Sequence, residues 1–280
     1  MSVASTGIVR IRPEHVASNG TPELWWLLTS KSWTDPLPIN FYIVDHRDGL
    51  VLFDAGQDRA SITDPSYFPG GPMRYLYNRL ARFEIAPAET VRRLLASEGY
   101  DIGDVRKVVL SHLHQDHIGG LPELGHAELY VAEREWETLR QPFPLLHGIM
   151  PKHIDLPGLR WHKIHFGESA MPRSTETWYD LMGDGSLMLV PTPGHTPGSI
   201  SLLVKDSPGK PLLFVGDLTY SCDLLHAGVV PGVGNVRQLE LSSTKVRALE
   251  TEFPGLCILA AHDPAARTSL RASGAMQPSG

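Results

Sequence analysis

A cluster of His and Asp side chains, all of types that bind metals, directly follows an apolar run in this sequence. Residues 111–120 read SHLHQDHIGG and come after RKVVL, which predicts a strand, and loops at strand ends are where a rigid sheet places reactive side chains. His112 and His114 are two positions apart, so on an extended backbone they point the same way and can hold one ion. Asp116 and His117 lie one step further along and can hold a second ion. One short motif can therefore bind two metals.

Three further candidate ligands each follow an apolar run elsewhere in the chain. His195 comes after LMLVPTPG, Asp217 after LLFVG and His262 after LCILAA. We expect the seven side chains, from four strand ends, to meet at one edge of a sheet system. Their chemistry suits borderline divalent ions such as zinc, and iron, manganese and cobalt also fit, so histidine alone does not identify the metal. A surface or core hydrogen-bonding role, which is usual for a lone histidine, does not explain this recurrence.

Apolar patterning predicts a chain in which strands precede helices twice. The strand-like runs lie at residues 39–45, 49–54, 106–111, 128–132, 186–192, 199–204, 211–217 and 256–261. Helical patterns lie at residues 87–99, 132–141 and 236–253. We expect one domain over residues 1–280, and the small polar residues after about residue 266 predict a loop or a frayed end.

Composition and charge argue against several classes of function. The chain has 280 residues, a formal charge of −6 and no basic cluster, so nucleic acid is not an expected substrate. The sequence has no run of about 18 apolar residues and no signal-peptide pattern, so we expect a cytoplasmic protein that does not enter a membrane. Cys222 and Cys257 are too few for a disulfide framework and are expected to be structural thiols.

The motif HLHQDH, followed by a further His, an Asp and a last His, resembles the metallo-β-lactamase superfamily over about residues 8–265. The resemblance implies an αββα sandwich, in which helices flank two mixed sheets and the site lies at the sheet edge. Asp54, in VLFDAG, matches an Asp of the family that supports the site without binding metal, although the segment also fits a simple turn. The resemblance further implies that one metal is bound by His112, His114 and His195, the other by Asp116, His117 and His262, and that Asp217 bridges both.

Four segments narrow the resemblance to the N-acyl homoserine lactonases, the quorum-quenching branch of this superfamily. They read SHLHQDHIGG, TPGHTPGS, GDLTY and AAHDP. In these lactonases a Tyr at the spacing of Tyr220 assists ring opening, and a neutral phenol can hydrogen-bond a carbonyl oxygen more strongly as negative charge builds on it. Tyr220 also fits a buried aromatic residue at a strand-to-loop junction. Gln115 stands where the lactonases frequently have an apolar or aromatic residue, which leaves the acyl-chain preference open.

The expected reaction is hydrolysis. Two divalent ions lower the pKa of a bound water to about 7, so a hydroxide that bridges them can attack a carbonyl or phosphoryl centre without a separate strong base. The resemblance implies that the substrate is a small-molecule lactone or ester, in the first place an N-acyl homoserine lactone. Asp116 could pass a proton to the leaving alkoxide.

Other activities on the same scaffold stay open. They include a thioesterase similar to glyoxalase II, an esterase, a phosphotriesterase and an iron dioxygenase. A bridging Asp217 disfavours a β-lactamase, and His114 disfavours a flavodiiron protein. A purely structural metal site is disfavoured because seven ligands exceed what such a site requires.

Aromatic residues in the first third of the chain suggest where a substrate tail and a partner bind. Trp33 and Phe68 sit among small and polar residues, which makes them candidates for lining a pocket for an apolar tail, although core packing also fits each of them. Residues 67–83 are aromatic, basic and helix-prone after a Gly-Pro turn. In related enzymes this region can form a partner surface, so a homodimer is a further expectation.

Overall fold

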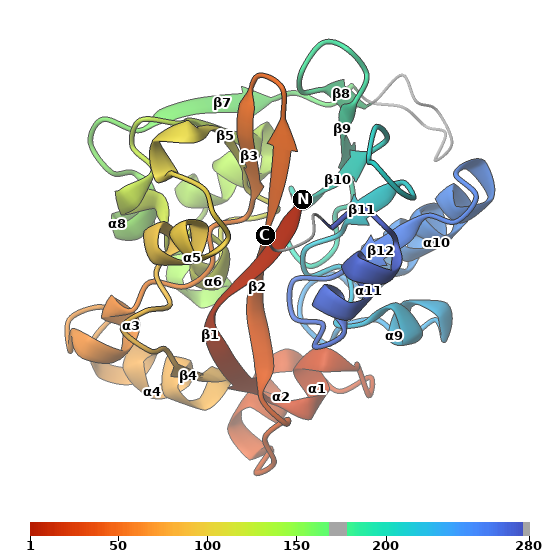
Figure 1. The fold of residues 1–280 in the computed structure, drawn as a ribbon. Helices are drawn as coiled ribbons and strands as arrows, with labels where there is room; N and C mark the ends of the chain where they lie inside the picture. Colours follow the sequence, from red (N-terminus) through yellow and green to blue (C-terminus); the bar gives the residue numbers. More distant parts are fainter. Residues whose placement is uncertain (168–177, 277–280) are drawn as a thin grey trace.

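Two mixed β-sheets pack face to face in the computed structural model of the protein, and helices cover both outer faces (Figure 1). The structure describes residues 1–167 and 178–276. Within these residues the first sheet has seven strands, in the order β4 (Ala81–Glu84), β1 (Ser2–Ile11), β2 (Leu37–His46), β3 (Gly49–Phe53), β5 (Val105–Val109), β6 (Glu128–Ala132) and β7 (Arg160–Ile164). The second sheet has five, in the order β12 (Cys257–Leu259), β11 (Leu212–Phe214), β10 (Ile200–Val204), β9 (Leu187–Pro191) and β8 (Tyr179–Asp180). This arrangement confirms the predicted αββα sandwich.

The inner strands are apolar on both faces because each sheet is covered on both sides. In β3, Val51 and Phe53 point into the core between the two sheets. Leu50 and Leu52 alternate with them and point into the core between the first sheet and its outer helices. Two buried cores thus fix the backbone of the central strands, and with it the points at which the strands end.

The helices form two outer layers and a third group near one end of the sheets. Outside the first sheet lie α5 (Val91–Ser97), α6 (Gln115–Ile118) and α8 (Pro151–Ile154), and beside the second lie α9 (Cys222–His226), α10 (Val236–Glu252) and α11 (Ala266–Ala272) (Figure 1). At the lower end in Figure 1 lie α1 (Pro13–Val16), α2 (Glu23–Thr29), α3 (Ala60–Thr63) and α4 (Gly71–Leu80). The remaining helix is α7 (Glu133–Trp136), and the 3-10 turns are η1 (Ile102–Asp104), η2 (Leu121–Glu123), η3 (Glu137–Arg140) and η4 (Pro144–His147).

All eight predicted strands are confirmed, as β2, β3, β5, β6, β9, β10, β11 and β12. The helix predicted over 87–99 is the shorter α5, and the one predicted over 132–141 is α7 followed by the 3-10 turn η3. Strands β1, β4, β7 and β8 were not predicted, and the longest of these is β1. Its apolar pattern is interrupted by Gly7, which has a φ of 112°, and by a register shift between Ser5 and Ile8.

The prediction of a loop or frayed end after about residue 266 is wrong for residues 266–272. They form α11, which contacts β1 and β12. Ala266 and Leu270 are buried in the core between the sheets. The small side chains that suggested a frayed end instead allow the helix to pack closely against the strands.

Cys222 and Cys257 are both free and half-buried. Among residues 1–167 and 178–276, no helix has both the length and the apolar character that crossing a bilayer requires.

Candidate metal centre

The loops that follow β5, β9, β11 and β12 meet at one edge of the two sheets. Because each loop leaves a buried strand, its side chains are positioned by the sheets. The side chains that these loops bring together are His112, His114, Asp116, His117, His195, Asp217 and His262, and we call them the metal centre.

The first group in the metal centre consists of three imidazoles. His114 Nδ1 lies 3.0 Å from His112 Nε2 and 3.0 Å from His195 Nε2. These three ligand atoms lie close enough to surround one ion. Burial is the main cause that lowers the pKa of each imidazole, so all three are neutral at pH 7 and can bind a metal through a free lone pair.

The second group combines two imidazoles with a carboxylate. His262 Nε2 lies 3.5 Å from Asp116 Oδ2, and His117 Nε2 lies 3.8 Å from Asp116 Oδ1. These ligand atoms also lie close enough to surround one ion. Burial alone would lower the pKa of His262, but the carboxylates of Asp217 and Asp116 raise it to about 10. Without an ion His262 therefore carries a proton, which a bound cation must displace.

The Asp217 carboxylate lies between the two groups. Its Oδ1 is 3.4 Å from His117 Nε2 and 3.4 Å from His262 Nε2, whereas its Oδ2 is 3.6 Å from His195 Nε2. One oxygen thus faces each group, as a bridging carboxylate requires. The bridging role and the division of ligands between two ions remain predictions.

Buried polar atoms without partners test whether divalent ions fit here. Among the described residues, His117 Nε2 and Asp217 Oδ1 are buried and make no hydrogen bond, although they lie 3.4 Å from each other. Leaving a buried donor or acceptor unsatisfied costs about 1–3 kcal/mol. A cation between these atoms removes that cost for both. Five imidazoles and two carboxylates are also a donor set typical of zinc and similar ions, so the residues present fit such ions.

Contacts on the far side of the rings hold four of the five imidazoles in place. Such outer partners orient the ring and fix which nitrogen is free to bind metal. They are Ser111 Oγ at 3.0 Å from His112 Nδ1, the carbonyl of His147 at 3.0 Å from His114 Nε2, Asp54 Oδ2 at 2.9 Å from His117 Nδ1, and the carbonyl of Pro38 at 2.8 Å from His262 Nδ1.

Asp54 supports the metal centre from outside. Its Oδ1 accepts a 2.7 Å hydrogen bond from the backbone N–H of Ser111, and its Oδ2 accepts one of 2.9 Å from the Ser111 hydroxyl. The same Oδ2 orients His117. Asp54 has a φ of 66°, a left-handed conformation that Asp tolerates better than most residues. These contacts are more than a simple turn would provide.

Glu135 of α7 was not identified from the sequence, yet it joins two loops of the metal centre. Its Oε1 accepts a 3.0 Å hydrogen bond from the backbone N–H of Leu113. Its Oε2 accepts a 2.6 Å bond from the hydroxyl of Thr196 and a 3.0 Å bond from the N–H of Gly198. A Cβ at Gly198 would lie 2.1 Å from the backbone nitrogen of Glu135, so this approach requires glycine. No sequence signal distinguished Glu135 from the other acidic residues of its helix.

Tyr220 is buried beside the metal centre. Its hydroxyl donates a 3.3 Å hydrogen bond to Asp217 Oδ2, and its ring stacks on that of His262 with centroids 5.4 Å apart. Burial, followed by the carboxylates of Asp217 and Asp116, raises the pKa of Tyr220 well above its usual value, so the phenol is a neutral donor. Tyr220 is thus a buried aromatic residue whose hydroxyl also faces the centre. Its catalytic role remains a prediction.

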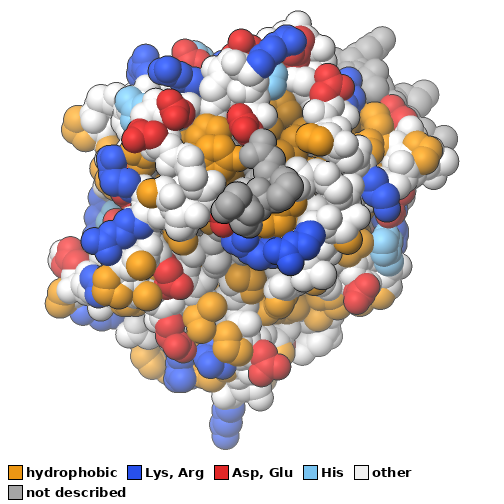
Figure 2. Space-filling model, viewed as in Figure 1, with side chains coloured by type: hydrophobic (Ala, Val, Ile, Leu, Met, Phe, Trp, Pro, Cys, Tyr) orange, Lys and Arg blue, Asp and Glu red, His pale blue; other side chains and the backbone are white. Residues whose placement is uncertain are grey.

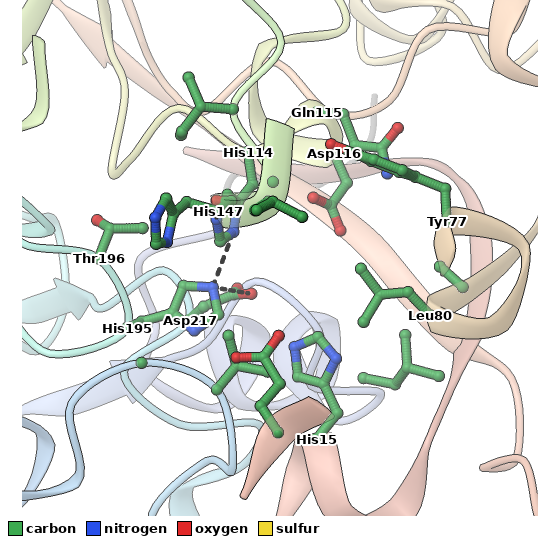
Figure 3. Close-up of a pocket in the computed structure, with 18 of the residues that line it drawn as sticks. His15, Tyr77, Leu80, His114, Gln115, Asp116, His147, His195, Thr196 and Asp217 are labelled. Carbon is green, nitrogen blue, oxygen red and sulfur yellow. Dashed lines mark hydrogen bonds and ion pairs between the residues drawn. The ribbon is translucent and has the colours of Figure 1, made fainter. Parts of the chain in front are cut away.

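A cavity of about 410 Å³ opens onto the metal centre, a size typical of small-molecule sites (Figure 3). Figure 3 shows Tyr77 and Leu80 of α4 on the side of the cavity opposite His195. The cavity lining is polar beside the metal centre and apolar along one wall. That wall includes Leu27 of α2, Leu76, Tyr77 and Leu80 of α4, Phe83 of β4 and Leu145 of η4.

Trp33 and Phe68 do not line this cavity, so that prediction is wrong. Trp33 lies under the guanidinium groups of Arg12 and Arg82, whose central carbons are 3.7 and 4.2 Å from the ring centroid. Phe68 packs against Tyr77 with ring centroids 5.4 Å apart, and so supports a lining residue. The polar neighbours of these two residues in the sequence did not show which surface each ring covers.

The predicted partner segment, residues 67–83, forms α4 and most of β4 and contributes to the cavity wall. Tyr75 of α4 and Trp25 of α2 are 57% and 65% exposed. Figure 2 shows hydrophobic side chains at the surface over this lower end of the molecule, among charges of both signs. The homodimer remains a prediction.

The chain is similar in sequence to proteins of a known family. The sequence profile of the metallo-β-lactamase superfamily matches residues 34–262. The chain is 32% identical over 241 residues to N-acyl homoserine lactonase AttM of Azorhizobium caulinodans. The matched region covers 84% of this chain and 85% of that protein. The chain is 30% identical over 234 residues to AttM of Agrobacterium fabrum, covering 81% and 82% of the two chains.

Solved structures share the fold. A mutant of AiiA from B. thuringiensis, with N-decanoyl-L-homoserine bound at its active site, has a TM-score of 0.75 at 21% identity, covering 96% of this chain and 94% of that one. AidC, described as a dizinc quorum-quenching lactonase, has a TM-score of 0.62 at 19% identity, covering 95% and 87%. The predicted resemblance is confirmed: the chain belongs to the metallo-β-lactamase superfamily, and its relatives there include the N-acyl homoserine lactonases.

Proposed function

We propose that this protein is a metal-dependent hydrolase that opens the lactone ring of N-acyl homoserine lactones. The observation that carries the proposal is the position of Tyr220, whose hydroxyl lies 3.3 Å from Asp217 Oδ2 at the polar end of a cavity with an apolar wall. A polar reaction centre beside an apolar wall matches a substrate that joins a lactone to an acyl chain. The relatives named N-acyl homoserine lactonase support this choice of substrate.

The metal centre would hold two divalent ions, which we propose to be zinc. The histidine-rich donor set supports zinc, and so does the description of the structurally similar AidC as a dizinc enzyme. Such ions, when bound, supply Lewis acidity and a water that is activated near neutral pH. His112, His114 and His195 would hold one of them, Asp116, His117 and His262 the other, and Asp217 would contact both.

In this proposal Tyr220 stabilises the oxyanion that forms as the ring opens. Its neutral phenol donates a hydrogen bond to the lactone carbonyl, and the bond strengthens as negative charge builds on the oxygen. Stacking on His262 and burial hold the ring in place before the substrate binds. The donor therefore needs little rearrangement during the reaction.

Asp116 is proposed to move the proton. Its side chain is 18% exposed and lines the cavity, whereas that of Asp217 is 4% exposed. After the nucleophile has added to the carbonyl carbon, a carboxylate oxygen of Asp116 can take the proton that the nucleophile still carries and pass it to the ring oxygen, which leaves as an alkoxide. Gln115 also lines the cavity, where it is in position to influence the acyl-chain preference.

Acid release measured in a pH-stat tests the proposed function. The zinc-loaded protein is assayed against short and long N-acyl homoserine lactones, δ-lactones, thioesters and a phosphotriester. We expect the highest kcat/KM for an N-acyl homoserine lactone, loss of the activity after chelation and its return with zinc. Hydrolysis of a thioester or phosphotriester without lactone opening would contradict the proposal and identify a different hydrolase. Oxygen consumption that depends on iron would exclude hydrolysis as the main reaction.

A further inference from the structure

His15 of α1 lines the cavity beside the metal centre, and no metal-binding role accounts for it. Both of its ring nitrogens are buried, and neither has a hydrogen-bond partner among the described residues. Figure 3 shows the ring pointing from α1 into the cavity, between Asp217 and Leu80. An imidazole with two unsatisfied nitrogens therefore faces the space that a substrate occupies.

Packing alone does not account for a histidine at this position. The ring centroid lies 5.7 Å from that of Tyr220, 6.0 Å from that of Trp26 and 6.2 Å from that of His195. A phenylalanine would make similar ring contacts without burying polar atoms. Burying both nitrogens without partners is unfavourable, and a ligand in the cavity could remove that cost.

The two ring nitrogens of His15 limit which ligand group it suits. A neutral imidazole has one N–H donor and one nitrogen acceptor. A secondary amide offers the complementary pair, a carbonyl acceptor and an N–H donor.

The position of His15 agrees with this chemistry. It contacts Tyr220 and His195 at the reacting end of the cavity, and it lines the same cavity as Leu27 and Leu80 of the apolar wall. In an N-acyl homoserine lactone the amide lies between the lactone ring and the acyl chain. The amide would thus lie at the boundary between polar and apolar lining, which is where His15 is found.

We propose that His15 determines specificity by hydrogen-bonding the amide of the N-acyl homoserine lactone. This inference rests on the proposed function, because it names a contact to that substrate. His15 in this role selects lactones with an amide side chain over alkyl lactones of similar length. It takes no part in the bond-making steps.

A pair of substrates tests this contact. The variant His15→Phe is compared with the wild-type protein on an N-acyl homoserine lactone and on an alkyl γ-lactone of matched length that lacks the amide. We expect kcat/KM to fall roughly 10- to 100-fold for the amide substrate, because phenylalanine leaves the amide without a hydrogen-bond partner. For the alkyl lactone, which has no amide to pair, kcat/KM should fall less than about 3-fold. His15→Gln, which keeps a donor and an acceptor, should recover part of the loss.

Two further measurements separate this role from a structural one. Metal content of each variant should match the wild type, and His15→Phe should unfold at the same or a higher temperature, because it buries no unsatisfied nitrogen. Calorimetric binding of the ring-opened N-acyl-L-homoserine should weaken in His15→Phe. Equal losses on both substrates, or no loss on either, would overturn the inference while leaving the lactonase proposal standing. A wild-type protein that opens neither lactone would instead overturn the proposed function, and this inference with it.

Discussion

Glu135 Oε2 accepts a 2.6 Å hydrogen bond from the hydroxyl of Thr196, the residue that follows His195. The other oxygen of the same carboxylate accepts from the N–H of Leu113, which lies between His112 and His114. One buried side chain therefore sets the distance between the two loops that supply the first group of ligands. Glu135 is a positioning residue in this arrangement, because it acts through the loops.

The substitution Glu135→Gln should weaken metal binding at the first group. All three partners of the carboxylate are donors, so an amide must turn its NH₂ group towards one of them. We expect metal affinity to fall roughly 10- to 100-fold, as for other partners that orient ligands. Chelator competition measures this loss, and Thr196→Val, which leaves the carboxylate with two donors, should lose less. Full retention of both ions by Glu135→Gln would show that the loops do not need the carboxylate.

Asp217→Asn should weaken the binding of both ions. A neutral amide compensates two cations less well than the carboxylate that lies between the groups. Elemental analysis after dialysis should find less than two ions per chain. Asp206→Asn, at an exposed position, is the matched control and should bind metal as the wild type does. If Asp217→Asn kept full metal and activity, the bridging assignment would be wrong.

Tyr220→Phe should keep both metals and the fold while lowering kcat roughly 10- to 1,000-fold, the scale on which one transition-state donor operates. KM should change less. The structure adds a control, because the lost hydroxyl also donates to Asp217. Metal content must therefore be measured in the same preparation. A change confined to KM would mean that the hydroxyl only positions the substrate.

Lys245 of α10 gives a prediction of stability away from the metal centre. Its Nζ donates a 3.1 Å hydrogen bond to the carbonyl of Pro191, and burial lowers its pKa from 10.5 to about 8. Between these two pH values the unfolded chain keeps a proton that the folded protein has released, so this group makes the free energy of unfolding rise with pH. Urea unfolding at several pH values across this window should show the wild type gaining stability relative to Lys245→Met. Parallel curves for the two proteins would contradict the lowered pKa.

Local sequence predicted the metal-binding motif and the layers of the fold for the same reason. The ligands follow apolar strands, and buried strands and their ends can be recognised in a sequence as short apolar runs. Contacts between segments far apart in the chain could not be predicted from the sequence. Glu135 and Thr196 are 61 positions apart, and the contact depends on how α7 packs against the loop after β9. His15 lies in a short helix whose sequence has no pattern that places it beside a site more than 90 residues further along the chain.

Zinc titration of the metal-free protein relates lactone opening to the number of bound ions. The central claim is that seven side chains form a two-ion centre that opens lactones. The rate of N-acyl homoserine lactone opening is followed as zinc is added in steps, and the bound ions are counted in the same samples. The rate should rise until two ions are bound per chain and then stay constant. Full activity with one ion per chain, or two bound ions without lactone opening, would contradict the claim.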